Sequence, residues 1–367
     1  PGRPYLDAIE WTTAMPVQTQ RYRFEEGSLD VVRELTLSDS ARFEADPRWR
    51  GLTARTTGKT TNAIFLNTEV APFDRVAVRR AVSLAIDPSF LSLVRTDVAE
   101  TDRVLPPSVP GPEREKPMRV HDLQKALAMM AEAGLGFDPE TGEGGWDAPI
   151  DYVTVPDSFE QQAAEVYAQQ LSKIGLRVRL KLLPFASYLA EVSRRRATAM
   201  GWTGWTADFP DPSNFFEPTL SSQAIQDEGS QNVAFFASAE LDRVLTDARS
   251  EHDRAKRMAL YARAEEIVRD NAPWVPTSVP RPMEVRQPYV RGYRTHPILP
   301  APLAEVWLDA AARAVASASC DRSLIFFGAA WPGSSAQARC GPHADRSARI
   351  DGAGGGSVRK VRAWGWP

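Results

Sequence analysis

Residues 150–182 have the sequence IDYVTVPDSFEQQAAEVYAQQLSKIGLRVRLKL. From Asp157 to Ile174, apolar residues recur at the three- and four-residue spacing of one helix face, namely Ala164, Tyr167, Leu171 and Ile174. After Gly175, apolar and basic side chains alternate over residues 176–182, which is typical of a strand with one basic face. With a further strand at residues 150–155, the segment predicts a strand, a helix and a strand, joined by a right-handed crossover.

Other segments repeat these two periodicities. Helices are predicted at residues 74–87, at 122–133 before Gly134, and at 250–270, and a strand is predicted at 274–279. Helices and strands therefore alternate along the chain. This order predicts an α/β fold with mixed sheets flanked by helices.

The composition is that of a globular protein. The 367 residues include 44 Lys and Arg against 47 Asp and Glu, the formal net charge is −3, and 43% of the residues are hydrophobic. This balance argues against a disordered chain and against nucleic-acid binding through bulk charge. No apolar run approaches the roughly 18 residues of a membrane-spanning helix. Two domains are expected at this length.

The two ends of the chain differ from its body. The sequence begins at Pro1 without a signal-peptide pattern, so we expect a fragment or a processed form. Residues 311–367 are dominated by Ala, Gly, Ser and Arg and contain both cysteines, Cys320 and Cys340. Such a composition builds little core and predicts a low-complexity, disordered tail. A disulfide framework is ruled out for the body.

Several short motifs occur in one order along residues 63–273. They are AIFLNT at 63–68, PFD at 72–74, VRRAVSLAID at 78–87, LPP at 105–107, EAG at 132–134, GWTGWTADFPDP at 201–212, Asn232, LD at 241–242 and AP at 272–273. Taken together, they resemble the extracytoplasmic solute-binding proteins of family 5, the oligopeptide- and dipeptide-binding proteins of ABC transporters.

The resemblance implies a two-lobed fold of the periplasmic-binding-protein type, whose lobes close around a ligand by a hinge. On this pattern, residues 1–72 are the C-terminal part of the first lobe, residues 73–280 are the second lobe, and residues 281–310 return to the first lobe. Complete members have an N-terminal portion that this chain lacks. We therefore expect an N-terminally truncated chain with an incomplete first lobe.

Aromatic and acidic residues gather at 202–216, namely Trp202, Trp205, Phe209, Phe215 and Phe216 with Asp208 and Asp211. A carboxylate and aromatic faces together suit an ammonium group. The resemblance implies that Asp208 holds the α-amino group of a bound peptide and that Gly204, Trp205 and Thr206 line the ligand with backbone groups. Trp202 stands where some oligopeptide binders have a basic residue, and it completes the predicted ligand-binding set.

Two points stay open at this site. Asp208 can instead serve a turn before Pro210, with the aromatic side chains in the core, and Asp211 is assigned mainly to the turn. The arginine that clamps the ligand carboxylate in dipeptide-binding members is replaced by Thr154. The run at residues 194–196 is typical of a solvated helix end. Ligand length therefore stays open, and a non-peptide ligand with an amine or a sugar-like body is an alternative.

An enzyme is the less favoured interpretation. Asp208, Asp211 and Glu217 supply carboxylates of the kind that glycoside hydrolysis needs, but their spacing in a proline-rich loop does not direct them to one cleft. The sequence contains neither His-Glu-x-x-His nor Cys-x-x-Cys, and no Gly-x-Ser-x-Gly motif. We predict no catalytic residues, no metal site and no cofactor.

These observations predict a non-catalytic, substrate-binding component of an ABC transporter, which captures a peptide or related solute and delivers it to the permease subunits. We expect a monomer that binds no nucleic acid. The resemblance places it in the periplasm or another extracytoplasmic compartment, associated with the membrane through the transporter. The alternative is a truncated, degenerate fragment that acts only as an interaction module, and a carboxylate-dependent hydrolase comes third.

Overall fold

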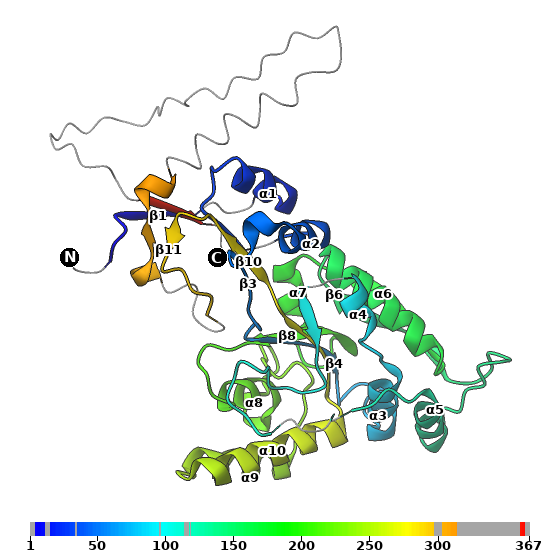
Figure 1. The fold of residues 1–367 in the computed structure, drawn as a ribbon. Coiled ribbons are helices and arrows are strands. Elements are labelled where there is room, and N and C mark those ends of the chain that lie inside the picture. Colours follow the sequence, from blue (N-terminus) through cyan, green and yellow to red (C-terminus); the bar gives the residue numbers. More distant parts are fainter. Residues whose placement is uncertain are drawn as a thin grey trace, which may run out of the picture. The chain divides into compact units, whose positions relative to one another are not determined.

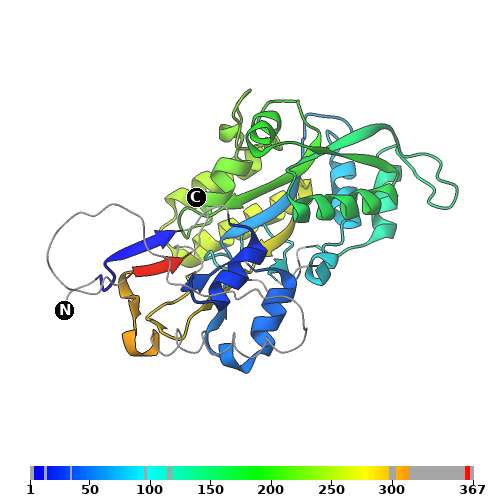
Figure 2. The same ribbon diagram turned by 90° about the horizontal axis from the view of Figure 1, so that it is seen from above.

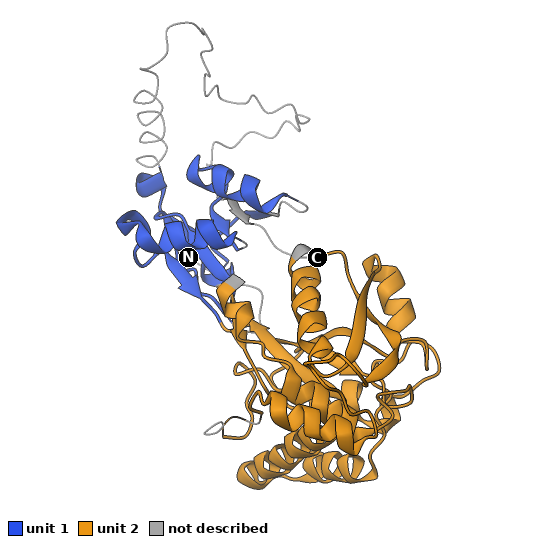
Figure 3. Ribbon diagram, turned by 90° about the vertical axis from the view of Figure 1, so that its right-hand side faces the viewer, with its two compact units in different colours: residues 1–56, 282–367 blue, residues 57–281 orange. Residues whose placement is uncertain are grey.

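The structure is a computed structural model that describes residues 4–11, 15–33, 35–94, 97–113, 117, 119–296, 303–313 and 360–363. The chain forms two compact units (Figure 3). Unit 1 comprises Pro1–Thr56 and Pro282–Pro367, and unit 2 comprises Thr57–Arg281.

Unit 2 is built on a mixed six-stranded sheet (Figures 1 and 2). The order of its strands is β5-β9-β4-β8-β6-β7. Its strands are β4 (Thr60–Leu66), β5 (Val98–Glu100), β6 (Trp146–Thr154), β7 (Leu176–Leu182), β8 (Met200–Thr206) and β9 (Trp274–Pro280). β6 runs parallel to both β7 and β8, whereas the pairings of β4 with β8 and β9, and of β5 with β9, are antiparallel.

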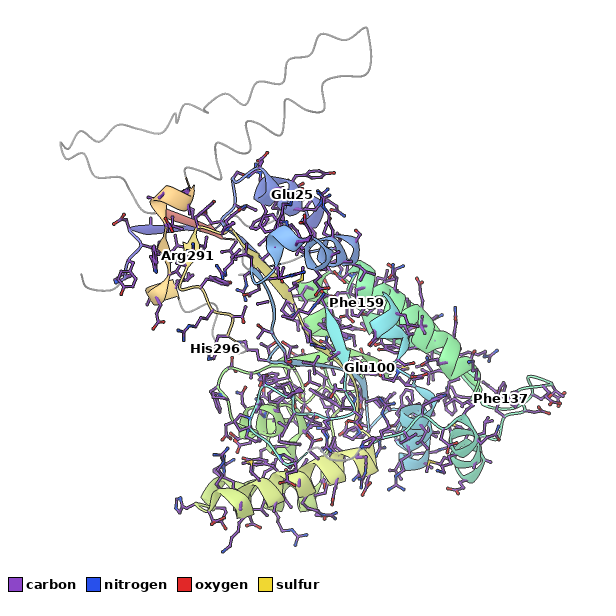
Figure 4. All side chains as sticks on the ribbon, in the orientation of Figure 1. Glu25, Glu100, Phe137, Phe159, Arg291 and His296 are labelled. Carbon is purple, nitrogen blue, oxygen red and sulfur yellow. The ribbon has the colours of Figure 1, made fainter. Side chains whose placement is uncertain are left out.

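Alternate residues of these strands enter two hydrophobic clusters. Ala63 and Phe65 of β4 belong to the first cluster, and Ile64 and Leu66 belong to the second. Helices that contribute to the first cluster are α7 (Phe185–Val192), α8 (Ser213–Leu220), α9 (Ala239–Ser250) and α10 (Arg254–Asn271). Helices that contribute to the second are α3 (Val76–Ala85), α4 (Phe90–Val94), α5 (Leu123–Glu132) and α6 (Ser158–Ser172). Phe159, at the start of α6 (Figure 4), lies in the second cluster.

Unit 1 contains a smaller five-stranded sheet with the order β1-β13-β2-β10-β3. Its strands are β1 (Ala8–Trp11), β2 (Val31–Val32), β3 (Thr53–Arg55), β10 (Met283–Arg286) and β13 (Lys360–Ala363). The helices α1 (Val17–Glu25) and α2 (Leu37–Ala45) and the turn η1 (Pro47–Trp49) pack Phe24, Phe43 and Trp49 into one aromatic cluster. The short strands β11 (Val290–Arg291) and β12 (Trp307–Leu308) form a separate pair.

The predicted α/β class and the predicted strand, helix and strand are confirmed. β6 precedes α6 in the sequence, β7 follows it, and the two strands pair in parallel. α6 begins after Asp157, because the Asp157 carboxylate accepts hydrogen bonds from the N–H groups of Phe159 and Glu160. The predicted helix at 250–270 is wrong at its start. α10 begins at Arg254, since Asp253 caps it, and residues 239–250 form the separate helix α9.

The unit boundaries differ in part from the lobe boundaries that the sequence predicts. Residues 57–72 fall in unit 2 because β4 pairs with β8 on one side and with β9 on the other. The predicted disordered tail at 311–367 lies mostly outside the described residues. At residues 360–363 the prediction is wrong, because these residues form β13 and pair with β1. The backbone N–H and C=O groups at the edge of a strand such as β1 can pair with any segment that adopts an extended conformation.

Candidate functional site

The central strand β8 is paired along its whole length on one side and only at its start on the other. β4 matches it from Thr60↔Thr206 to Leu66↔Met200. β6 pairs with it only at Met200 and Gly201 and ends at Thr154. The second half of β8 therefore has a free edge within the sheet.

The hydrogen-bond alternation of β8 shows which backbone groups face this edge. The Ala207 N–H donates to the Lys59 C=O at 2.9 Å, so Trp205 and every second residue before it turn their backbone groups toward β4. Gly204 and Thr206 therefore turn their N–H and C=O groups the other way, beyond the end of β6. These groups can pair with an extended ligand as an added strand does.

Gly204 packs closely against β4. A Cβ atom at this position would lie 2.9 Å from the Asn62 Oδ1 atom and 3.2 Å from the Thr61 C=O. A side chain at residue 204 would therefore displace the Asn62 side chain and press slightly on the β4 backbone.

The two tryptophans of β8 differ in their surroundings. Trp202 lies against Tyr188 of α7 with ring centroids 5.5 Å apart, and the Tyr188 hydroxyl donates a hydrogen bond to the Trp202 C=O. Trp202 contacts both hydrophobic clusters, which makes it largely a packing residue. Trp205 is half-buried, and its Nε1 atom lies 3.4 Å from the Asn214 Oδ1 atom.

Asp208 follows β8 and is exposed. Its N–H donates to the Asn214 Oδ1 atom at 2.8 Å, and its Oδ2 atom accepts from the Asn214 Nδ2 atom at 3.3 Å. Within the described ranges the Asp208 carboxylate forms no ion pair, so it can accept a cation from solution. Asn214, a buried amide in α8, orients both Asp208 and Trp205. In the sequence, Asn214 stands between Ser213 and two phenylalanines, and no periodicity marks it as a buried amide.

Asp211 has a structural role, as the sequence indicates. Its carboxylate accepts two hydrogen bonds from Arg257, at 2.7 and 2.8 Å, and further ones from the Ser213 N–H and hydroxyl groups. Burial opposes ionisation of Asp211, but the hydrogen bonds from Arg257 and Ser213 outweigh it and lower the pKa of the carboxyl group. Glu217 is likewise paired, with Arg249 at 3.2 Å. The three carboxylates considered for hydrolysis therefore include only one that is unpaired.

An apolar surface lies at the junction of β7 and α7. Leu182, Phe185 and Leu189 are 39%, 59% and 47% exposed, and the Phe185 ring stacks on Tyr188 at a centroid distance of 6.2 Å. Tyr188 in turn contacts Trp202 of β8. Sequence reasoning missed this surface, although Phe185 directly follows Pro184, which precedes the helix.

The three consecutive arginines near β8 are all paired. Arg194 pairs with Glu191, Arg195 with Glu69 and Asp227, and Arg196 with Glu69. Their hydrogen bonds, that from Arg195 first, lower the pKa of the Glu69 carboxyl group against its partial burial. These guanidinium groups therefore form ion pairs within unit 2. Thr154 is fully buried.

Among the described residues, no group of three or more His, Cys, Asp and Glu side chains is arranged to hold a metal ion. No helix in that part of the chain combines the length and the apolar character that crossing a membrane requires.

Comparisons with known proteins cover most of this chain. The sequence model described as "Bacterial extracellular solute-binding proteins, family 5 Middle" matches residues 1–227. Heme-binding protein A of Haemophilus influenzae is 31% identical over 301 residues, which are 81% of this chain and 53% of that protein. Di/tripeptide-binding protein 2 of Pseudomonas aeruginosa is 24% identical, over 84% of this chain and 56% of that protein.

Solved structures agree with these matches. The periplasmic binding protein DppA of Helicobacter pylori, in complex with the peptide STSA, has a TM-score of 0.65 and 25% identity over 80% of this chain and 55% of that one. The clavulanic acid biosynthesis oligopeptide binding protein 2 has a TM-score of 0.71 at 22% identity, which shows the fold. The chain spans about half the length of the curated relatives it matches. It belongs to the bacterial extracellular solute-binding proteins of family 5.

Proposed function

We propose that the chain is the solute-capturing part of an ABC transporter and binds a peptide or a related amine-bearing solute along the free edge of β8. The observation that carries this proposal is the pair of outward-facing backbone positions, Gly204 and Thr206, beyond the end of β6. An extended peptide offers the complementary N–H and C=O groups at the same spacing.

Asp208 supplies the charge in this proposal. It lies two residues beyond Thr206, it is exposed, and its Oδ1 atom makes no hydrogen bond within the described part of the chain. A ligand ammonium would form a charge-assisted hydrogen bond there while the ligand backbone follows β8. The ligand would then be bound jointly by Gly204, Trp205, Thr206 and Asp208. Trp202 would support this edge of β8 through its packing.

Phe185 and its apolar neighbours extend the proposed site. Their exposed side chains are joined to β8 through Tyr188, and they suit an apolar side chain of the ligand. Arg194, Arg195 and Arg196 are paired with Glu191, Glu69 and Asp227, so none of them is left to hold the carboxylate of a short peptide. We propose a ligand anchored by its amino end, with its length set elsewhere.

Several related proteins support a peptide-like solute. They are di/tripeptide-binding, dipeptide-binding and glutathione-binding proteins, whereas heme-binding protein A of Haemophilus influenzae is named for a non-peptide ligand. Following the family, we propose an extracytoplasmic location and delivery of the solute to permease subunits by a monomeric, non-catalytic protein. Closure of two lobes by a hinge belongs to this proposal as well.

The alternative function is that of an interaction module without solute binding. Native mass spectrometry of gently purified protein, followed by thermal-shift screening of short peptides, distinguishes the two. A co-purified solute or a saturable stabilisation by free-amino peptides supports the transporter role, because a ligand that binds only the folded state raises its stability. A chain that carries no solute and responds to no peptide would support the alternative.

A further inference from the structure

A cavity in unit 2 is lined by residues of α3, α5 and the end of α10 and by residues 119–122, none of which belongs to the proposed solute site. It has a volume of about 530 Å³, and four of its lining residues are basic: Arg80, Arg119, Lys125 and Arg269. Its acidic lining residues are Asp122 and Asp270. Each acid is already paired, Asp122 with Lys125 at 3.1 Å and Asp270 with Arg269 at 2.8 Å. Two guanidinium groups therefore lack a carboxylate partner in this cavity.

Most N–H groups of the Arg80 guanidinium make no hydrogen bond within the described ranges. It is exposed, its Nε–H donates to the Asp270 C=O, and its two terminal nitrogens make no hydrogen bond within the described ranges. The preceding residue behaves differently. Arg79 is buried and donates to the C=O groups of Asn271 and Phe73, so it secures the end of α10. Arg80 thus presents a two-nitrogen fork that the fold itself does not use.

Arg119 adds a second cation at the floor of the cavity. Its terminal nitrogens donate to the C=O groups of Ser83, Ile86 and Pro276, and its Nε atom is buried without a partner. Burial lowers the pKa of Arg119, and burial followed by the charge of Arg80 lowers the pKa of Arg79 to about 10. Asp102 and Asp87 attract Arg119, but among the residues that line the cavity four cations face only two carboxylates. The lining therefore carries a net positive charge, which an anion would neutralise.

The geometry points to a binding site for a phosphate-bearing organic anion in this cavity. The fork of Arg80 matches two phosphate oxygens, and Lys125 and Arg269 lie on the same lining. Leu84 and Met129 also line the cavity and would contact the apolar part of the ligand. The ligand is either a small phosphate ester or the headgroup of an anionic lipid. This site is separate from the proposed solute site and does not depend on it.

Capping of helix ends explains only part of this arrangement. One terminal nitrogen of Arg119 donates to C=O groups at the end of α3 and the other to the Pro276 C=O of β9. The C=O groups at the end of α10 accept from the Nε atoms of Arg79 and Arg80. The terminal nitrogens of Arg80 have no such role. They distinguish a binding site from a purely structural cluster.

The test is a calorimetric titration of the full chain with glycerol 3-phosphate at constant ionic strength, adjusted with sodium chloride. Saturable binding is expected, at least tenfold weaker in Arg80→Gln and about threefold weaker in Arg80→Lys, which keeps the charge but loses the fork. Arg243→Gln is the matched control, since Arg243 is also exposed on a helix and donates from Nε to a backbone C=O, that of Ala239. It should bind like the unsubstituted chain.

Lys125→Gln checks the location independently and should weaken binding at least threefold. Cosedimentation with phosphatidylglycerol vesicles, but not with phosphatidylcholine vesicles, would identify a lipid headgroup, and its absence alongside glycerol 3-phosphate binding would identify a small ester. The proposal is overturned if the chain binds neither probe, or if Arg80→Gln and Arg243→Gln bind equally well.

Discussion

Asp208→Asn separates a ligand-binding role of this residue from a turn-forming role. The substitution keeps the shape of the side chain and one oxygen that can accept from the Asn214 Nδ2 atom. In the unsubstituted chain this atom lies 3.3 Å from the Asp208 Oδ2 atom. The local fold should therefore persist, with a change in unfolding free energy within about 0.5 kcal/mol, as for surface substitutions that break no special contact. Only the negative charge is lost.

The expected loss of affinity follows from the exposure of Asp208. At about 3 Å, two unit charges interact by roughly 1.4 kcal/mol at the dielectric constant of water and by roughly 5.5 kcal/mol at an effective value of 20. Asp208 is exposed in the free chain and becomes covered only by the ligand, so the lower half of this interval applies. Hydrogen bonds to charged groups contribute about 1.5–3 kcal/mol. Binding should therefore weaken by about 10- to 150-fold.

Calorimetry with one tripeptide in its free-amino and Nα-acetylated forms measures this loss. In the unsubstituted chain the free-amino form should bind more tightly, and in Asp208→Asn the two forms should bind alike. Asp247→Asn is the control, because Asp247 is an exposed carboxylate on α9 without a hydrogen bond or ion pair in the described part of the chain. Unchanged affinity in Asp208→Asn, or an equal loss in both variants, would refute the ammonium site.

Three further substitutions test the supporting structure. Asp211→Asn should lower the unfolding free energy by about 1–2 kcal/mol at pH 7, since it removes the charge and replaces the Oδ2 acceptor of one Arg257 hydrogen bond by an NH2 group, while Oδ1 still accepts the other. Because the pKa of Asp211 is lowered in the fold, denaturation curves of the two proteins should converge as pH falls below 3.8, the ordinary value of the group. Gly204→Ala should cost about 1 kcal/mol in chemical denaturation, because its Cβ would displace the Asn62 side chain at 2.9 Å and press on the Thr61 C=O at 3.2 Å; unaltered stability would contradict the close approach. Phe185→Ala should leave stability within about 0.5 kcal/mol, since the ring is 59% exposed, and should weaken calorimetric binding of an aromatic peptide more than that of a glycine peptide.

The elements of the fold were largely predictable from local patterns. The helix face from Ala164 to Ile174 and the alternation over residues 176–182 depend on neighbouring residues alone, and both elements formed where predicted. Lobe boundaries were less predictable. β4 belongs to unit 2 because it pairs with β8 and β9, strands well over a hundred positions away in the sequence.

The candidate site was predictable only in part. The sequence indicated Asp208 and the residues of β8 through family resemblance, and their ligand-binding roles stay predictions. The free edge beyond Thr154 could not be inferred, because it depends on where a neighbouring strand ends. The same holds for Arg195, whose partner Glu69 is 126 positions away. Hydrogen-bond partners such as Asn214 become visible only when the chain is folded.

Residue-resolved amide hydrogen exchange at β8 tests most directly the claim that the ligand pairs with the free edge. In the free chain, the amides of Gly204 and Thr206 should exchange faster than that of Trp205, which is paired with β4. With a saturating peptide whose binding calorimetry has established, both should slow by at least tenfold while Trp205 changes little. If the peptide is bound and both amides exchange at their original rates, the solute does not lie along β8 and the central claim is wrong.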